Sequence, residues 1–549
     1  MKKTINTLWI MLAIAGLCTS FSGCSSYLDS ETPSVVTDEF YNTKEGQEKL
    51  IVDLYSKFRS VYNTGELQYY GTDLYMAITE TQSERMFNGY DATFNSTAPV
   101  VGSYWNNLYK IVQESNILLT RCTEDIAGND YAAMNARGHF FRALAYYYLV
   151  ETFGPVPFYT IEQSEVLYEV ARTPEQEIYD FLIQDLEAVL GTLSFGKSVA
   201  GEVNDAAVTF LLGKLYLTRA YKPYGGSADF TRAAALFDLI NNSAEYQLLD
   251  SYAASYDENN QNNSEVIWAI QYGTDRNFQG SGNPQQALFG FNIVAVEPNL
   301  FVYNQSDYSS MSRGYWVIPS AHEYFTNSSL DTRYDVTFKR EFTVNNTASG
   351  NYGTLGIYFP RWDDNSGDTQ GALRYYPFKT STGEYNWYPQ STALAVLASA
   401  IDRMPIVNKF KDTKMDWGLA GTREDVAFRL GDAYLLGAEA YLGAGQVSNA
   451  LARVNTLRRR AAADEEAYDN YLKASTVDLD FILDERAREL FGEHDRWFDL
   501  KRTGKLIERA AAKNIFVQKY DNLKAMHLVR PIPQDEINKT NGLEQNEGY

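Results

Sequence analysis

Cysteine and histidine are scarce in this chain of 549 residues, which contains 3 Cys and 4 His. Cys18 and Cys24 lie in or just after an apolar stretch near the N-terminus, so Cys122 is the one cysteine in the body of the chain. A single thiol cannot form an internal disulfide, and a lone cysteine within a helical pattern is typically buried. So few histidines argue against a His-rich metal site.

Net positive charge is also missing. The 48 Lys and Arg residues are outnumbered by 70 Asp and Glu residues, which gives a formal net charge of -22 at pH 7. A surface with this charge repels phosphate backbones, so nucleic acid is excluded as a partner. The charge favours solubility and is compatible with a neutral ligand.

The chain lacks an apolar run of the about 20 residues that a transmembrane helix needs. The apolar stretch from Leu8 to Leu17 is shorter, follows two lysines, and fits the hydrophobic region of a secretory signal. Phe21-Ser22-Gly23-Cys24 then resembles the bacterial lipobox, in which the cysteine is lipidated. We therefore predict a lipoprotein signal peptide over residues 1–23, lipidation of Cys24 and a lipid-anchored tether over residues 24–40. Ordinary signal cleavage nearby, with Cys24 incidental, is the alternative.

Compact catalytic motifs are absent too. The sequence has no Gly-x-Ser-x-Gly elbow and no phosphate-cradling glycine loop, and His322-Glu323 lacks the second histidine of a zinc-protease helix. We predict that the protein is not an enzyme, has no catalytic residues and needs no cofactor. The loop with Asp363, Asn365 and Asp368 loosely resembles a calcium loop, but it lacks the EF-hand Gly and Glu positions, so Ca²⁺ is a weak candidate there and a solvated turn is the alternative.

Helical periodicity fills the first half of the chain and returns near the end. Leu212-Gly213-x-x-Tyr216 recurs as Leu430-Gly431-x-x-Tyr434, each followed by alanines and a second helical stretch. Small residues at these places let two helices pack closely, as in tetratricopeptide pairs, and a generic helical hairpin is the alternative. We predict a mainly α fold in which helical-pair segments cover residues 44–245 and 422–510.

Residues 250–420 have a different composition, rich in Asn, Gly, Tyr and Trp, with little helical periodicity. Only short pieces look like strands, for example Glu265 to Tyr272. So much irregular chain within one domain favours a large loop-rich insertion that carries function. Residues 41–549 are predicted to form a single domain with this insertion.

Aromatic residues are abundant, with 41 Tyr, 29 Phe and 8 Trp. Most are expected to fill the core, but aromatic faces flanked by amides and charges also stack on sugar rings. Trp105 precedes Leu108 and Ile111 at helical spacing, so we expect it in the core. Two stretches have the composition of a sugar site, and their candidate ligand-binding residues are Arg85, Phe87, Asn88, Tyr90 and Tyr104 in the first and Tyr315, Trp316, Trp362 and Trp387 in the second.

A series of motifs, which span almost the whole chain after the predicted signal peptide and keep their order, resembles the SusD/RagB family of outer-membrane nutrient-binding lipoproteins. The motifs are Leu28-Asp-Ser-Glu-Thr-Pro33, Trp105-x-x-Leu-Tyr109, Phe141-Arg142-Ala143 running into Phe153-Gly154, Val454-Asn455-x-x-Arg458-x-Arg460, Glu485-Arg-Ala-Arg-Glu489, Arg496-Trp497-Phe498-Asp499, and Pro531-Ile-Pro533. Arg458, Arg460, Glu485, Arg486 and Glu489 within them are expected to form ion pairs between helices and are not assigned to a site.

The resemblance implies a helical scaffold with tetratricopeptide-like units, with loops that build the ligand surface. It also implies a lipid anchor in the outer membrane with the protein facing the cell exterior, and a SusC-like TonB-dependent transporter as partner. The implied ligand is a nutrient, foremost an oligo- or polysaccharide, that is bound and delivered without catalysis. An exported glycoside hydrolase and a binder of peptide or another non-sugar nutrient are the alternatives.

Overall fold

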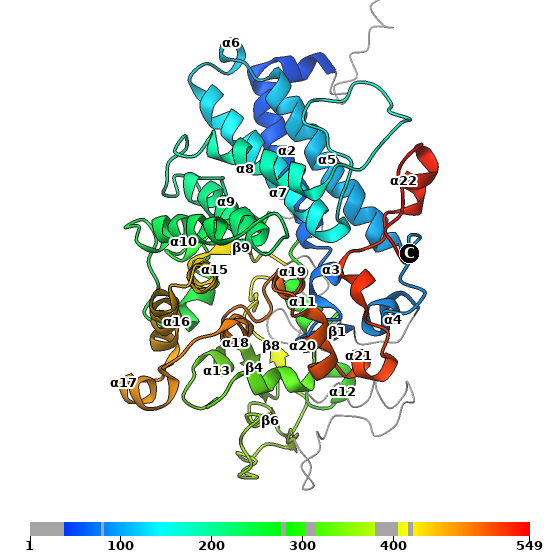
Figure 1. Ribbon diagram of the computed structural model, residues 1–549. Coiled ribbons are helices and arrows are strands. Elements are labelled where there is room, and N and C mark those ends of the chain that lie inside the picture. The colour runs from blue at the N-terminus through cyan, green and yellow to red at the C-terminus, as the bar shows by residue number, and fades with distance from the viewer. Residues whose placement is uncertain are drawn as a thin grey trace, which may run out of the picture.

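The computed structural model describes residues 38–77, 82–275, 282–290, 293–303, 314–378, 405–415 and 421–549, apart from the side chains at 82–85 and 295–296 (Figure 1). The predicted signal peptide, Cys24 and Trp387 lie outside the described residues, as does the side chain of Arg85.

Helices build most of the body, which confirms the predicted mainly α fold. The longer ones are α2 (Lys44–Tyr62), α5 (Pro99–Arg121), α7 (Tyr131–Phe153), α8 (Glu175–Glu187), α9 (Asp205–Ala220), α10 (Ser227–Asn241), α15 (Leu430–Gly443), α16 (Val447–Ala461) and α18 (Leu479–Glu489). Shorter ones are α3 (Glu66–Tyr69), α4 (Gln82–Gly89), α6 (Glu124–Ala127), α11 (Gln285–Phe289), α12 (Ile293–Val296), α13 (Arg333–Thr337), α17 (Glu465–Ala467), α19 (Arg496–Arg502), α20 (Leu506–Lys513), α21 (Ile515–Tyr520) and α22 (Gln534–Lys539), with single turns at η3 (Asp38–Asn42), η4 (Gly128–Asp130), η5 (Ala253–Tyr256), η6 (Pro319–Tyr324), η7 (Tyr468–Leu472) and η8 (Ala525–Leu528). No helix in the described ranges is both long and apolar enough to cross a bilayer.

Side-chain caps fix where several helices begin. Asn204 accepts a hydrogen bond from the backbone N–H of Ala207 at the start of α9, and Thr43 accepts one from Gly46 at the start of α2. Such caps satisfy backbone donors that have no partner within the helix. The start of α8 differs from the usual pattern, since Pro174 precedes the helix and no side chain caps it.

Consecutive helices pack as pairs. α9, α10, α15 and α16 lie side by side in chain order, as expected for tetratricopeptide-like units (Figure 1). A Cβ atom at Gly213 in α9 would lie 3.0 Å from the ring of Phe237, and one at Gly437 in α15 would lie 3.3 Å from the Phe237 side chain. The two glycines therefore let both helices approach Phe237 of α10 closely, which is the role predicted for small residues here.

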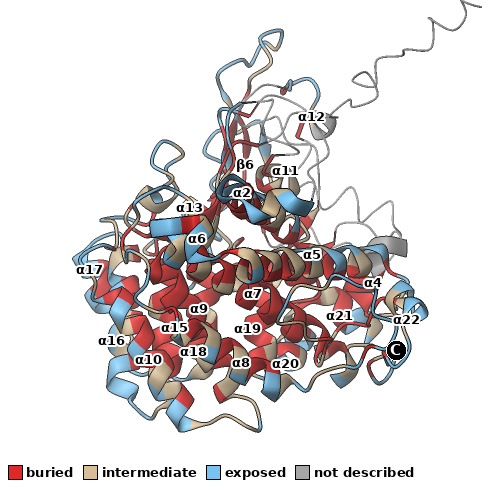
Figure 2. Cartoon of the chain, turned by 90° about the horizontal axis from the view of Figure 1, so that it is seen from above, coloured by how far each residue is buried: buried red, intermediate tan, exposed pale blue. Residues whose placement is uncertain are grey.

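The central part of the chain, between α10 and α15, consists mainly of short strands and loops, with the short helices α11, α12 and α13. Its strands are β2 (Val266–Ile270), β3 (Tyr315–Val317), β4 (Phe338–Lys339), β5 (Glu341–Thr343), β6 (Leu355–Tyr358), β7 (Arg374–Tyr375), β8 (Ile406–Val407) and β9 (Asp425–Arg429), and β1 (Tyr75–Ala77) lies earlier in the chain, between α3 and α4. They form the small sheets β1–β3, β2–β9, β4–β8 and β5–β6–β7, and the last projects from the helical body (Figure 2).

Two boundaries differ from the sequence prediction. The chain re-enters the helical body through β9, which pairs antiparallel with β2, before α15 begins at Leu430. Helices also continue beyond residue 510, as α21 and α22. Both segments are too short for periodicity to reveal them.

The core lies around α7, in which every residue from Phe140 to Phe153 is buried (Figure 2). A buried ion-pair network lies around α18. Arg333 pairs with Asp331 at 2.7 Å, with Glu485 at 2.7 Å and with Glu489 at 3.3 Å.

The same network contains the charged residues predicted to link helices. Arg458 pairs with Glu485, Arg460 pairs with Glu489, and Arg486 pairs with Asp432 and Asp499. These residues connect α16, α18, α15 and α19, so the prediction of interhelical ion pairs is confirmed.

Candidate functional site

The first predicted aromatic stretch packs against β1. The side-chain amide of Asn88 in α4 donates to the carbonyl of Ala77 at 2.9 Å and accepts from the Ala77 backbone N–H at 2.8 Å. Phe87 and Tyr90 beside it are 2% and 3% exposed. The stretch therefore anchors α4 to the end of β1.

The second predicted stretch joins the first through sheet pairing. In the register of β1 and β3, Trp316 lies opposite Met76. The ring of Tyr70 lies 5.6 Å from that of Phe87 and 5.4 Å from that of Tyr315. We call Tyr70, Phe87, Tyr315 and Trp316 the aromatic junction, because it brings together two stretches more than 200 residues apart in sequence.

Burial corrects the expectation for most of these residues. Phe87, Asn88, Tyr90, Tyr104 and Tyr315 are all at most 5% exposed. A ring this enclosed has no free face on which a sugar could stack. In the described structure these side chains are buried and present almost no surface to a ligand.

Trp316 is buried as well, at 5% exposed, and its indole Nε1 has no hydrogen-bond partner among the described residues. The hydroxyl of Tyr104 and the Nε1 of Trp497 share this property. A buried polar group without a partner costs free energy, so each of these atoms can accept a water molecule or another polar group as partner.

Trp362 lies in a separate part of the insertion. It is half-buried, and its Nε1 donates to the carbonyl of Phe325 at 2.9 Å, directly after η6. Next to it, Arg361 pairs with Asp335. The ring of Trp362 is more accessible than the rings of the junction, and an accessible ring is what stacking on a sugar requires.

The candidate calcium loop does not gather its carboxylates. Asp363 accepts from the backbone N–H and hydroxyl of Ser328, whereas Asp368 accepts from the backbone and side chain of Gln370. No group of three His, Cys, Asp or Glu side chains suited to a metal exists in the described ranges. The two aspartates are occupied by separate neighbours, as in a solvated turn.

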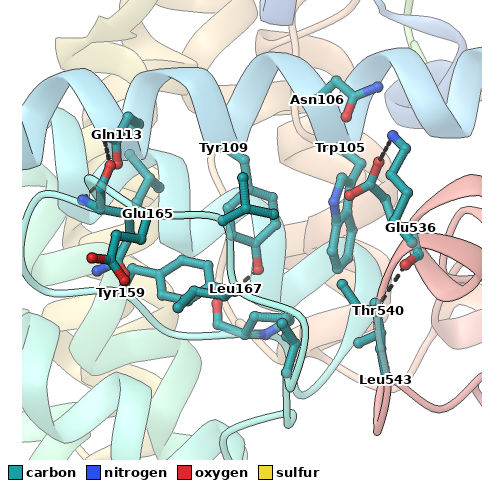
Figure 3. A pocket seen from close by; sticks show the side chains of 16 residues that line it. Trp105, Asn106, Tyr109, Gln113, Tyr159, Glu165, Leu167, Glu536, Thr540 and Leu543 are labelled. Carbon is teal, nitrogen blue, oxygen red and sulfur yellow. Dashed lines mark hydrogen bonds and ion pairs between the residues drawn. The ribbon is translucent and has the colours of Figure 1, made fainter.

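A pocket that the sequence did not reveal lies between three distant segments. It has a volume of about 360 Å³, and its walls come from α5, from residues 155–174 and from α22 with the residues after it. Figure 3 shows Trp105 and Tyr109 of α5 pointing down towards the other two segments. We call residues 155–174 the strap and this cavity the strap pocket.

Hydrogen bonds from α5 hold the first half of the strap in place. The Tyr109 hydroxyl donates to the carbonyl of Pro157 at 2.7 Å, and the Asn116 amide donates to the carbonyl of Tyr159 at 2.9 Å. The Gln113 side chain donates to the carbonyl of Gln163 and accepts from its N–H. Burial raises the pKa of Tyr109, so its hydroxyl remains a neutral donor.

Trp105 confirms the prediction that it lies in the core, being 3% exposed, yet it also lines this pocket. The rest of the lining could not be recognised from sequence. Tyr159 and Leu167 lie in a segment without periodicity, and Leu543 lies far away near the C-terminus. The amides of Gln113 and Asn116, at inward positions of an otherwise apolar helix face, were the one local signal.

Family models match both halves of the chain. A model described as "SusD family" matches residues 264–549, and one described as "Starch-binding associating with outer membrane" matches residues 26–217. The chain is 24% identical to SusD-like protein P25 of Formosa agariphila, over 94% of this chain and 93% of that protein. It is 26% identical to the starch-binding protein SusD of Bacteroides thetaiotaomicron, over 78% of this chain and 75% of that protein.

Solved structures share the fold. A laminarin-binding SusD-like protein superposes with a TM-score of 0.65 at 23% identity, covering 92% of this chain and 100% of that one. A SusD homolog from Bacteroides thetaiotaomicron superposes with a TM-score of 0.71 at 18% identity, covering 93% and 99%.

Proposed function

Because the chain belongs to the SusD family, we propose that it is a non-catalytic lipoprotein that binds a nutrient glycan at the cell surface. The single observation that carries the proposal is the pair of family models, which together match residues 26–217 and 264–549. Two relatives are named for binding starch and laminarin, which are both neutral polysaccharides. A neutral glycan also suits a protein with a net charge of -22.

We further propose that Cys24 carries the lipid and that the bound glycan passes to a SusC-like TonB-dependent transporter in the outer membrane. The lipobox-like sequence before Cys24 supports the anchor. A family described as associating with the outer membrane agrees with this location.

The glycan surface is proposed around Trp362 and Trp316, two of the candidates named from the sequence. Trp362 is half-buried and has the more accessible ring, which suits stacking on a sugar. Trp316 is buried and would contribute its Nε1 donor, which has no hydrogen-bond partner among the described residues and could bind a sugar hydroxyl.

Titration calorimetry of the purified protein against a panel of neutral oligosaccharides, including starch and laminarin fragments, tests the proposal. At least one of these oligosaccharides should bind.

The variant Trp316→Phe keeps an aromatic ring but removes the indole N–H. It should weaken glycan binding by roughly 1 kcal/mol, since one hydrogen bond is lost. Trp362→Ala and Trp387→Ala should each cost roughly 1–3 kcal/mol if their rings stack on the sugar.

Trp497→Phe is the matched control, because Trp497 is a buried tryptophan in α19 that lies outside the junction. Binding by none of the glycans, together with binding of peptides, would replace the glycan by a non-sugar nutrient. Release of shortened glycans during incubation would show a hydrolase and contradict the non-catalytic role.

A further inference from the structure

A second cavity lies between α2, α7, residues 200–202 and the end of β2. Its volume is about 610 Å³, which falls within the roughly 300–1,000 Å³ that small-molecule sites occupy. We call this cavity the α2 pocket. None of the candidate ligand-binding residues named from the sequence lines it, so the proposed glycan surface does not account for it.

One wall of the α2 pocket is a single face of α2. Ile51, Tyr55 and Arg59 line it at a spacing of four residues, which places their side chains one above the other on the helix. Ile51 is buried, as are Met134 of α7 and Ile270 of β2, which also line the pocket. The pocket therefore has an apolar base that three separate elements build.

The wall opposite α2 is held in place by hydrogen bonds. The hydroxyl of Tyr55 accepts from the backbone N–H of Val203 at 2.7 Å, and the Nε1 of Trp268 donates to the carbonyl of Gly201 at 3.0 Å. These contacts from α2 and β2 fix residues 201–203 relative to the helix. A pocket whose walls are already in place spares a ligand the entropic cost of ordering them.

Charged groups of both signs line the α2 pocket in equal number. Glu48 and Glu202 provide two carboxylates, and Arg59 and Arg137 provide two guanidinium groups. The formal charges of the lining cancel, so it favours neither an anionic nor a cationic ligand. A sugar hydroxyl both donates and accepts hydrogen bonds, and a set of guanidinium donors and carboxylate acceptors can satisfy both of its roles.

Both arginines keep donors that a ligand can use. Arg137 donates through Nη2 to Glu202 at 2.6 Å, whereas its Nε is buried and has no hydrogen-bond partner among the described residues. Arg59 uses two of its five N–H groups for the carbonyl of Gln271, at 3.0 and 2.7 Å. A buried N–H without a partner costs free energy, so a ligand oxygen that reaches the Nε of Arg137 gains from it.

We propose that the α2 pocket is a second glycan site, which binds a short segment of a neutral saccharide. The hydroxyls bind to the two guanidinium groups and the two carboxylates, and the C–H face of a sugar ring packs against the apolar base. The proposal rests on a glycan as the ligand of the proposed function, but it concerns residues other than Trp362 and Trp316.

Hydrogen–deuterium exchange followed by mass spectrometry locates the site. At saturating concentration, at least one of the neutral disaccharides cellobiose, maltose and laminaribiose should slow exchange of the backbone amides at 199–203. Ala200→Trp should abolish this protection, because Ala200 is an exposed residue of the lining and the indole would fill the cavity. Ala452→Trp is the matched control, since Ala452 is exposed on α16, which does not line the pocket.

The role of the Arg137 donor is tested by a conservative change. Arg137→Lys keeps the positive charge beside Glu202 but removes the Nε–H, so it should lower the affinity for the disaccharide about fivefold. Calorimetry in the Trp316→Phe/Trp362→Ala background measures this affinity without the proposed glycan surface. Arg232→Lys is the control, because Arg232 pairs with Glu187 outside the pocket. Equal affinities of the Arg137→Lys protein and its parent would overturn the proposal.

Charged sugars test the ligand class. Cellobiouronic acid and the cationic disaccharide of glucosamine should each bind the pocket about fivefold or more weakly than the neutral disaccharides, because the lining has no net charge. Tighter binding of either charged sugar would contradict a neutral saccharide as the ligand.

The outcomes separate this proposal from the proposed function. Glycan binding in calorimetry without protection at 199–203, or protection that Ala200→Trp leaves intact, would refute the α2 pocket as a site and leave the proposed function standing. Absence of binding by every glycan in both measurements would refute both. Thermal unfolding of each variant shows whether it is folded before its binding is compared.

Discussion

At single residues, the charge network around α18 shows how burial and pairing oppose each other. Burial alone would raise the pKa of Glu489, but Arg460, Arg429 and Arg333 outweigh it and lower that pKa to about 2. Taking two charges out of water is costly, and a buried pair is retained only when its geometry is good. Here Glu485 and Glu489 each meet more than one guanidinium, so the network fixes the relative positions of α16, α18 and β9.

The pKa of Glu489 predicts an acid-dependent loss of stability. The pKa of about 2 in the folded protein lies below the ordinary value of 4.5, so the contribution of Glu489 to stability is complete above about pH 4.5 and is lost as the pH falls through about 2. Glu489→Gln should therefore lower the free energy of unfolding most at pH 5–7, and the difference from the native protein should shrink towards pH 2. Urea denaturation of both proteins between pH 2 and pH 7 measures this difference in the free energy of unfolding.

Glu465→Gln is the control for this comparison. Glu465 forms an exposed pair with Arg459, in which both side chains are about 60% accessible. Exposed ion pairs contribute little to stability, so Glu465→Gln should have nearly the same free energy of unfolding as the native protein at every pH. A pH-independent effect of Glu489→Gln would contradict the assigned role.

At the scale of elements, close helix packing depends on where glycines lie. Gly213 faces the ring of Phe237, whereas a Cβ at Gly102 in α5 would meet no heavy atom within 4 Å. Both glycines are inside helices, where glycine costs backbone entropy. Gly213 allows the close contact with Phe237, whereas Gly102 makes no contact that requires a glycine.

The two glycines predict opposite effects on stability. Gly213→Leu should destabilise the protein by about 1–3 kcal/mol, because the new side chain collides with Phe237 at the α9–α10 interface. Gly102→Leu should stabilise it by up to about 1 kcal/mol, since leucine is a much better helix former than glycine. Thermal unfolding followed by circular dichroism compares them, and equal effects would show that α9 and α10 are not held as close as described.

At the scale of the whole molecule, the described chain forms one helical body from which the small sheet β5–β6–β7 projects (Figure 2). The strap, the aromatic junction and Trp362 are separate features of this body.

Removal of the lipid site predicts a change of location without a change of fold. Cys24→Ala should move the protein from the membrane fraction to the soluble fraction of disrupted cells, while its unfolding temperature stays the same. Cys122→Ala is the control, because Cys122 is buried in the core and should leave the protein in the membrane. Retention of the Cys24→Ala protein in the membrane would disprove the lipid anchor.

The sequence by itself determined the mainly helical fold, the close contacts at Gly213 and the interhelical ion pairs of Arg458 and Arg460. These follow from local periodicity, residue size and charge, which act over a few turns of chain. Periodicity also placed Trp105 in the core, since it shares a helix face with Leu108.

Tertiary structure alone decided which aromatic side chains are accessible. A tyrosine or phenylalanine suits a core and a sugar site equally well, so composition could not tell that Phe87 and Tyr315 are enclosed while Trp362 is half-buried. The strap pocket likewise depends on α5, an aperiodic segment and residues near the C-terminus meeting in space. Contacts between segments hundreds of residues apart are set by the packing of the whole body, because no local pattern encodes what covers a given face.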